Sequence, residues 1–375
     1  MSTPRNPSLI THPISKHALS VLALFMATLP AAQAAETGDR VSTIRVPGIS
    51  KIIKAARSVD GVIHLIGDGT GAPQYVRSAD GGATFSAPIP LVDSASRKPG
   101  LIFICWDIAV ASDGRVHVAL GTNAWQLKLP KEQWGFYYTS LAPGAKTFAP
   151  LKNLNKKPSE GFSLAAGANG AVTAFFLAGK IYAMVSRDGG KTFSASTELS
   201  SEYDPCKCCT TATTYGQDGK VAMMYREETN NDRDIYLALW DQSRGLKLSR
   251  TRISTTPWNL PTCPMTYFSV TPTAAGYVAA WPTKGQIYFA RMDKEGAVLP
   301  PGEIKTPGTN GMRTGVLALN ASDGSTLVSW KNNETLGWQL YDAGGQPQGS
   351  AGSAPSPGSG AAGVVLPSGK LLLFP

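Results

Sequence analysis

The sequence contains little charge and no apolar run long enough to cross a membrane. Charged residues make up only 16% of the 375 residues, whereas Gly (39) and Pro (27) are abundant. This composition argues against long helices and favours many short strands joined by tight turns. A membrane-spanning helix needs about 20 apolar residues, and the run Ala18 to Leu29 is shorter. We therefore expect an all-β protein with no transmembrane segment.

Several motifs that carry chemistry are missing as well. There is no P-loop and no H-E-x-x-H zinc-protease motif, so the sequence does not favour a nucleotide-binding or protease function. Lys and Arg outnumber Asp and Glu, 35 to 26, but no run of five basic residues occurs. Scattered basic residues are typical of a solvated surface, so we expect no nucleic-acid partner.

The N-terminus has the pattern of a secretory signal. Arg5 and Lys16 supply positive charge, Ala18 to Leu29 is the apolar run, and Ala32-Gln33-Ala34 fits the small-residue cleavage pattern. This predicts a signal peptide over 1–34, cleaved near Ala34, and a mature domain over 35–375. The mature charge is 33 minus 26, or +7. We expect a periplasmic or secreted protein.

Cysteine and histidine are scarce. The chain has five cysteines, and the mature part keeps only His64 and His117. Cysteines normally pair in an oxidising compartment. An odd number therefore predicts a free thiol, an intermolecular bridge or a metal ligand.

An internal repeat of about 50 residues is the dominant pattern, and this period is typical of propeller blades. Each unit holds two apolar strands joined by a glycine-containing turn, which predicts a hairpin. Seven such turns occur, centred on Asp60-Gly61, Asp113-Gly114, Asn169-Gly170, Asp218-Gly219, Ala275-Gly276, Asp323-Gly324 and Ser368-Gly369.

A second motif follows later in some units. Ser78 to Phe85 and Ser186 to Phe193 are near copies of S-x-D-G-G-x-T-F. The carboxylates of Asp80 and Asp188 are expected to cap backbone N–H groups, while Gly82 and Gly190 adopt positive φ. We interpret this motif as a structural turn between the two outer strands of a blade.

The S-x-D-G-G-x-T-F motif is the Asp box, and the chain therefore resembles the sialidase superfamily of BNR/Asp-box β-propellers over about residues 40–375. The resemblance implies four-stranded blades around a channel. Six blades are usual in sialidases, but the seven hairpins favour seven. Pairing of an N-terminal strand at 41–46 with the last hairpin at 361–374 would close the ring. The Gly/Ser/Pro-rich segment 349–360 is predicted to be a flexible surface loop.

Residues 204–263 concentrate the reactive chemistry. Cys206, Cys208 and Cys209 precede one predicted inner strand, and Cys263 precedes the next. In a propeller such loops gather on one face. A disulfide from Cys208 or Cys209 to Cys263 is the simplest interpretation. The alternative is a redox site or a thiolate metal site for copper(I) or zinc built from the four cysteines. Cys105 is expected to be a buried free thiol.

The sialidase resemblance also implies a catalytic set of three arginines, a Tyr–Glu pair and an Asp. Arg45-Val46-Pro47 resembles the family's Arg-Ile-Pro motif, and Arg226 ends a strand where the second arginine would fall. The sequence has Cys209-Thr210 where the Glu is expected, and Met312-Arg313-Thr314 where the Tyr is expected. Asp68 and Asp107 are the candidates for the acid. Exo-α-sialidase or other glycoside hydrolase activity is therefore the alternative function.

The leading hypothesis is a ligand-binding propeller. The combination C-x-C-C, Arg233-Asp234-Ile235-Tyr236 and Cys263-Pro264 resembles a narrower group of exported bacterial sialidase-like proteins. Arginines hold carboxylates by bidentate hydrogen bonds, and tryptophans offer stacking surfaces. We expect a monomer that binds an acidic glycan or a cell-envelope protein, without sialidase catalysis. The expected ligand-binding residues are Arg45, Arg226, Arg233, Asp234, Trp258 and Arg313.

Overall fold

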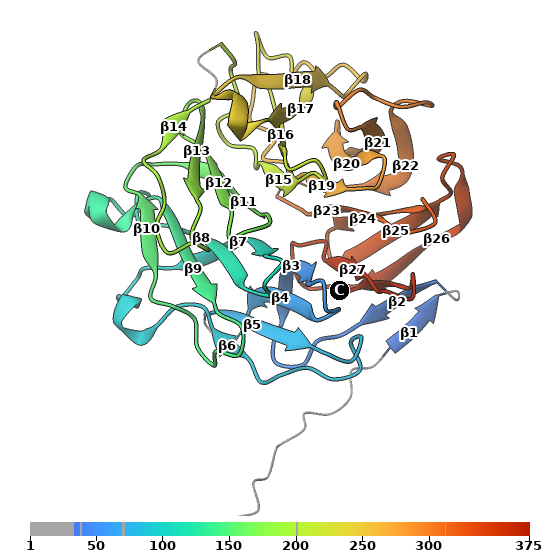
Figure 1. The fold of residues 1–375 in the computed structure, drawn as a ribbon. Helices are drawn as coiled ribbons and strands as arrows, with labels where there is room; N and C mark the ends of the chain where they lie inside the picture. The colour runs from blue at the N-terminus through green and yellow to red at the C-terminus, as the bar shows by residue number, and fades with distance from the viewer. Residues whose placement is uncertain (1–33, 38–39, 70–71, 200–201, 312) are drawn as a thin grey trace, which may run out of the picture.

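The computed structural model describes residues 34–37, 40–69, 72–199, 202–311 and 313–375. The chain forms a ring of seven four-stranded sheets around a central axis (Figure 1). This confirms the predicted all-β propeller and its seven blades, in place of the six that are usual in sialidases. The predicted signal peptide, apart from its last residue, lies outside the described residues.

Each of the first six blades is an antiparallel sheet whose strands follow one another in the chain. Blade 1 comprises β3 (Lys51–Arg57), β4 (Ile63–Asp68), β5 (Pro73–Ser78) and β6 (Ile89–Pro90). Blade 2 comprises β7 (Phe103–Val110), β8 (Val116–Thr122), β9 (Phe136–Leu141) and β10 (Lys152–Asn155). Blade 3 comprises β11 (Glu160–Ala166), β12 (Val172–Leu177), β13 (Ile181–Ser186) and β14 (Thr197–Glu198).

The next three blades repeat this order. Blade 4 comprises β15 (Ala212–Tyr215), β16 (Val221–Arg226), β17 (Ile235–Trp240) and β18 (Leu248–Arg252). Blade 5 comprises β19 (Ser269–Pro272), β20 (Gly276–Thr283), β21 (Gln286–Asp293) and β22 (Ile304–Thr309). Blade 6 comprises β23 (Val316–Asn320), β24 (Thr326–Asn332), β25 (Thr335–Tyr341) and β26 (Pro347–Pro355). Short 3₁₀ helices lie at Ser94–Ser96, Lys131–Gln133 and Gln242–Arg244.

The two ends of the described chain complete blade 7. Its order is β27 (Gly363–Val365), β28 (Leu371–Leu373), β2 (Val41–Ile44) and β1 (Ala34–Thr37). The C-terminus accordingly lies beside β2 in Figure 1. β2 runs parallel to β28, with Val41 opposite Leu371. The predicted pairing of the terminal strands is thereby confirmed, and it removes the free edge that an open ring would expose.

All seven predicted glycine-containing turns join the first two strands of their blades. The glycines at these turns have positive φ, for example 91° at Gly61 and 82° at Gly114. Such a backbone conformation is accessible to glycine at little cost. The hairpin pattern therefore located every blade.

The two Asp boxes cap the turns between third and fourth strands. The Asp188 carboxylate accepts hydrogen bonds from the Thr192 N–H at 2.9 Å and the Thr192 hydroxyl at 2.6 Å. The Asp80 carboxylate accepts the equivalent pair from Thr84. Gly190 approaches the Tyr138 hydroxyl of the neighbouring blade so closely that a Cβ would lie 1.7 Å from it. The Asp boxes therefore have a structural role.

The hydrophobic core lies between blades. The second strand of each blade is covered on both faces, and β16 and β20 are buried along their whole length. This explains why these strands are continuous apolar runs instead of alternating ones. The core between blades 4 and 5 joins Met224, Leu237 and Trp281 with Cys206 and Cys209. The cysteine region is therefore continuous with the core.

One predicted loop is a strand instead. Residues 347–355, which overlap the expected flexible segment 349–360, form the outer strand β26 and pair with β25. An edge strand needs only backbone hydrogen bonds and no buried side chains, so Gly, Ser and Pro are tolerated there. The composition of this segment was therefore misleading.

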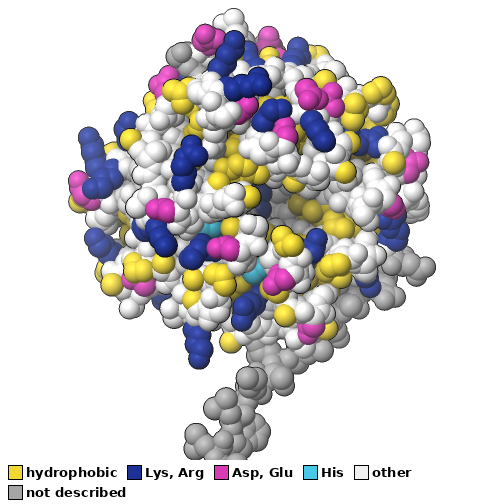
Figure 2. Space-filling view, in the orientation of Figure 1, with side chains coloured by type: hydrophobic (Ala, Val, Ile, Leu, Met, Phe, Trp, Pro, Cys, Tyr) yellow, Lys and Arg dark blue, Asp and Glu magenta, His cyan; other side chains and the backbone are white. Residues whose placement is uncertain are grey.

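Charge is spread over the face of the molecule that Figure 2 shows. Figure 2 shows Lys and Arg side chains around the rim, interspersed with Asp and Glu, without a single basic patch on the face in view. Among the described residues, no helix has the length and apolar character that a membrane crossing requires.

Candidate functional site

Three loops meet beside the core between blades 4 and 5. They are the β14–β15 loop, the β16–β17 loop and the β18–β19 loop. The Cys206 N–H donates to the Arg226 carbonyl at 2.8 Å, and the Arg233 N–H donates to the Trp258 carbonyl at 2.8 Å. These backbone hydrogen bonds tie the loops together. The structure thus brings the predicted residues from 204–263 to one place.

A disulfide joins Cys208 to Cys263, with the Cα atoms 6.4 Å apart. It links the loop entering blade 4 to the loop entering blade 5. Of the two pairings that the sequence left open, the structure has the one with Cys208. Both cysteines are half-buried. Because their sulfurs are bonded to each other, neither is a thiolate ligand for a metal in this state.

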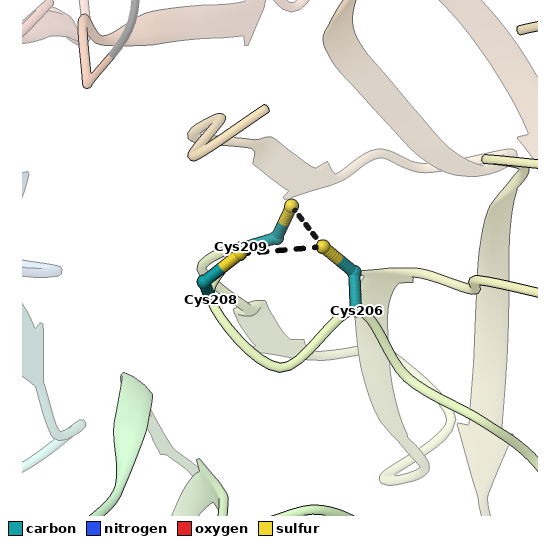
Figure 3. Close-up of side chains that lie close together, drawn as sticks. All are labelled: Cys206, Cys208 and Cys209. Carbon is teal, nitrogen blue, oxygen red and sulfur yellow. Dashed lines mark hydrogen bonds between the residues drawn. The ribbon is translucent and has the colours of Figure 1, made fainter. Parts of the chain in front are cut away.

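Cys206 and Cys209 form a second pair, which is reduced. Both are only 1% exposed. Their sulfurs lie 2.8 Å apart, and the Cys206 sulfur lies 3.8 Å from that of Cys208. Figure 3 shows the three sulfurs of this loop pointing toward one another. A buried dithiol therefore lies in contact with a less buried disulfide.

Arg226 is close enough to this dithiol for the two thiols to influence its pKa, and it is 1% exposed. Its guanidinium donates to the carbonyls of Arg233 and Pro282, at 2.9 and 2.5 Å. It also lies over the Trp258 ring, 4.7 Å from the centroid, in a cation–π contact. Among the residues that the structure describes, none is a hydrogen-bond partner of its Nε. Trp258 therefore packs on an arginine of the protein itself.

Arg233 is also buried, with 6% exposure. Its Nε donates to the Leu260 carbonyl at 3.1 Å, and its Nη1 donates to the Cys206 sulfur at 3.3 Å. The neighbouring Asp234 is paired with Arg252 at 2.7 Å. Within the described ranges, no carboxylate lies within 4.0 Å of the Arg226 or Arg233 guanidinium. The structure places both arginines against sulfur, backbone and aromatic rings.

These surroundings favour a thiolate at Cys209. Burial by itself opposes ionisation. The hydrogen bond from Cys206, the positive charge of Arg226 and contacts with Thr266 outweigh it, and they lower the pKa of Cys209 to about 6. The pKa of Cys206 is raised, first because its thiol is hydrogen-bonded to Cys209 and then because it is buried. The proton of the pair therefore resides on Cys206.

A cavity of about 190 Å³ opens beside the disulfide, and Cys208 forms part of its wall. Its lining includes four aromatic side chains, one cation and one carboxyl group among other polar residues: Trp106, Trp125, Phe162, Tyr267, Arg313 and Glu160. Trp125 is 41% exposed, and Arg313 is exposed. Aromatic faces and a few convergent polar groups are characteristic of small-ligand sites.

The backbone around this cavity is strained. Met265 and Arg313 both have positive φ, 46° and 57°, which is uncommon for residues other than glycine. The Arg313 N–H donates to the Met265 carbonyl at 3.0 Å, and the Arg313 Nε lies 3.0 Å from the Met265 sulfur. Strained residues that the surrounding structure holds in place are concentrated at functional sites.

Glu160, Tyr267 and Arg313 influence one another electrostatically. Burial raises the pKa of Glu160, the charge of Arg313 opposes this, and Cys209 adds to it. Burial likewise raises the pKa of Tyr267, which Arg313 lowers and Glu160 raises. A carboxyl group, a phenol and a guanidinium are thus grouped at the cavity.

The other predicted residues lie elsewhere. Arg45 and Asp68 do not line this cavity. Asp107 accepts N–H groups from Leu164 and Ile108 and lies 3.9 Å from Lys54, so it acts within the fold. His64 and His117 are buried on β4 and β8, each bonded to a tyrosine hydroxyl. Neither belongs to the cysteine region.

Sequence reasoning missed Glu160, Tyr267, Trp106 and Trp125. Glu160 begins β11, Trp106 lies in the first half of β7, and Tyr267 lies just before β19, separated from it by Phe268. Entry into an inner strand, the criterion that selected the cysteines, would have selected these three as well. Trp125 lies in the β8–β9 loop, which joins second to third strand.

Comparison with known proteins gives a likeness of fold only. No protein-family model matches the sequence, and no curated protein does. A chain of the mitotic checkpoint complex is 12% identical, with a TM-score of 0.55 over 99% of this chain and 95% of its own. A functionally unknown protein from Desulfotomaculum acetoxidans is 11% identical, with a TM-score of 0.54 over 88% and 99%.

A sialidase is among the similar structures. The NanB sialidase from Streptococcus pneumoniae is 11% identical, with a TM-score of 0.50 over 81% of this chain and 68% of its own. At this identity the likeness concerns the fold alone, because one fold carries many functions. The chain is a seven-bladed β-propeller, and sialidases are among the propellers that it resembles.

Proposed function

We propose that this protein binds a small acidic carbohydrate in the cavity beside Cys208, without hydrolysing it. The observation that supports the proposal is the grouping of Arg313 with Trp106, Trp125 and Tyr267 around one opening. A guanidinium pairs with a carboxylate, and aromatic faces pack against the apolar faces of sugar rings.

Of the arginines expected from the sequence to bind a ligand, Arg313 is the one that lines the cavity. Arg226 and Arg233 are buried and contact groups of the protein itself. Arg313 is exposed and lines the cavity. Of the candidate ligand-binding residues, it is therefore the one we assign to carboxylate recognition.

The binding test is calorimetric titration of the purified full chain with N-acetylneuraminic acid and glucuronic acid. Glucose, which lacks the carboxylate, is the ligand control. We expect saturable binding of an acidic sugar only, weakened at least tenfold, or about 1.4 kcal/mol, by Arg313→Ala. Trp125→Ala should weaken binding as well. Arg187→Ala removes an exposed arginine from an Asp box and should change nothing.

Equal binding by Arg313→Ala and the unaltered chain would overturn the assignment. So would the absence of binding to both acidic sugars.

A glycoside hydrolase is the second candidate, and one observation favours it. Tyr267 and Glu160 interact at the cavity, and the sialidase resemblance implies a Tyr–Glu pair as nucleophile. A fluorogenic sialoside tests this candidate. We expect no release above the uncatalysed rate. Release that disappears in Tyr267→Phe would instead establish hydrolysis, with Glu160 polarising the phenol.

Export is part of the proposal. The N-terminal pattern and the disulfide support a periplasmic or secreted location. Fractionation of cells that express the full chain, followed by N-terminal sequencing, tests it. The expected mature start is Ala35. Recovery of an uncleaved chain in the cytoplasm would contradict export.

A further inference from the structure

The four cysteines around residues 206–263 form two pairs at different depths. The disulfide Cys208–Cys263 is half-buried, and Cys208 forms part of the cavity wall. The dithiol Cys206/Cys209 is almost completely buried. The Cys206 sulfur lies 3.8 Å from the Cys208 sulfur and so connects the two pairs. Exchange between them needs no large movement of the backbone.

Two buried cations surround the dithiol. Arg226 and Arg233 have no carboxylate partner within 4.0 Å in the described part of the chain, and the Nε of Arg226 has no hydrogen-bond partner. Buried charges are normally paired, because an uncompensated one is costly. Negative charge on the sulfurs of Cys206 and Cys209 would compensate the two arginines. A disulfide between these cysteines would remove that negative charge. The arginines therefore favour the reduced state of the buried pair.

We propose that these cysteines form a thiol–disulfide relay, in which one disulfide moves between the accessible pair Cys208–Cys263 and the buried pair Cys206–Cys209. The relay does not depend on carbohydrate binding. Its accessible end faces the cavity, where an external thiol, small or on a protein, can exchange with Cys208.

The first step is attack within the loop. The Cys206 thiol gives its proton to the Cys209 thiolate, 2.8 Å away, and the Cys206 sulfur attacks the Cys208 sulfur. The Cys206–Cys208 bond forms, the Cys208–Cys263 bond breaks, and Cys263 leaves as a thiolate. Arg233, which donates to the Cys206 sulfur, stabilises the attacking thiolate.

The second step moves the bond into the core. The Cys209 sulfur attacks Cys206, the Cys206–Cys209 bond forms, and Cys208 leaves and takes the Cys209 proton. Two electrons pass from the buried pair to the accessible pair, so one is oxidised and the other is reduced. One thiol and one thiolate are present before and after, so the exchange needs no external oxidant.

Tryptic peptides distinguish the two states. Cleavage after Lys207 places Cys206 in peptide 192–207, both Cys208 and Cys209 in 208–220, and Cys263 in 253–284. The resting disulfide links 208–220 to 253–284. The relayed bond links 192–207 to 208–220. Acid quenching and alkylation of the full chain, followed by mass spectrometry, measure both links.

Cys209→Ser removes the residue that completes the second step. In this variant we expect the Cys206–Cys208 link together with alkylated Cys263, in a proportion independent of protein concentration. In the unaltered chain, the link between 192–207 and 208–220 should appear as a minor population. That measurement keeps the test valid if the variant fails to fold. Cys105→Ala removes a buried thiol of blade 2 and should not change either link.

Arg233 acts here as a positioning residue. Arg233→Gln should move the equilibrium at least threefold toward the buried disulfide, because the thiolate loses a buried cation. Arg233→Lys, which keeps the charge, should restore most of the original ratio. A purely structural role would alter stability without changing this ratio.

Three results would overturn the relay. The first is the absence of any link between 192–207 and 208–220 in both the variant and the unaltered chain. The second is two permanent disulfides with Cys105 as the only free thiol, which would make both pairs structural. The third is about one copper or zinc per chain that protects Cys206 and Cys209 from alkylation.

Discussion

Two buried histidines are expected to make the propeller acid-sensitive. His64 and His117 are 4% and 0% exposed and occupy equivalent positions on β4 and β8. The Nδ1 atom of each lies within 2.7 Å of a tyrosine hydroxyl, Tyr75 for His64 and Tyr138 for His117. Burial lowers the pKa of each from 6.5 to about 4. Both imidazoles are therefore neutral in the folded protein at neutral pH.

The size of this loss of stability follows from the linkage between proton binding and folding. Below pH 6.5 the unfolded chain takes up protons that the folded chain does not bind, so stability is present above pH 6.5 and falls toward pH 4. A histidine pKa that is lower by about 2.5 in the folded state corresponds to a loss of about 3.4 kcal/mol in the free energy of unfolding. This full loss is reached only below the folded-state pKa. At pH 5 the loss is about 2 kcal/mol for each, and about 4 kcal/mol for both.

Urea denaturation of the unaltered chain and of the double variant His64→Gln/His117→Gln measures this effect. The comparison cancels the contribution of carboxylates, which both proteins share. Between pH 7 and 5 the unaltered chain should lose about 4 kcal/mol more than the variant. Between pH 7 and 8 the two should change in parallel. Equal losses down to pH 5 would show that these histidines do not govern acid stability.

Three further predictions concern the fold. Cys263→Ser removes the disulfide to Cys208, which joins residues with a sequence separation of 55. The free energy of unfolding should therefore fall by about 4 kcal/mol. An unchanged midpoint of urea denaturation would contradict this prediction. Phe136→Ala opens the fully buried core between blades 2 and 3 and should cost about 3–5 kcal/mol, whereas the exposed Leu127→Ala should stay within about 0.5 kcal/mol. Ser42→Pro removes an N–H from β2, which pairs on both sides, and should cost about 1–3 kcal/mol. Ser42→Ala is the control, and equal melting temperatures of the two variants would argue against ring closure by β2.

The fold was predictable because its signals are local. A hairpin depends on a few residues, so turns such as Asp60-Gly61 and Asp113-Gly114 identify blades without knowledge of the rest. The Asp boxes are equally local. β26 was not predictable, because pairing of its backbone with β25 leaves no pattern in its side chains.

The site was predictable only in part. The loop topology correctly brought Cys208 and Cys263 together. The burial of Arg226 was not foreseen, because the Pro282 carbonyl and the Phe268 ring that enclose it come from blade 5 and the segment before it. Arg313 and Glu160 meet across the ring from segments about 150 residues apart. Local sequence patterns carry no information about proximity between such distant segments.

The parallel pairing of β2 with β28 has a consequence for the order of assembly. Six blades are built from neighbouring segments, and each can form as soon as its own stretch of about 50 residues is present. The seventh needs residues near both ends of the described chain, more than 300 positions apart. It can therefore form only after the others have brought those ends together. Loss of a few residues from β28 would leave six sheets and two open edges, so a small truncation would have the effect of a much larger one.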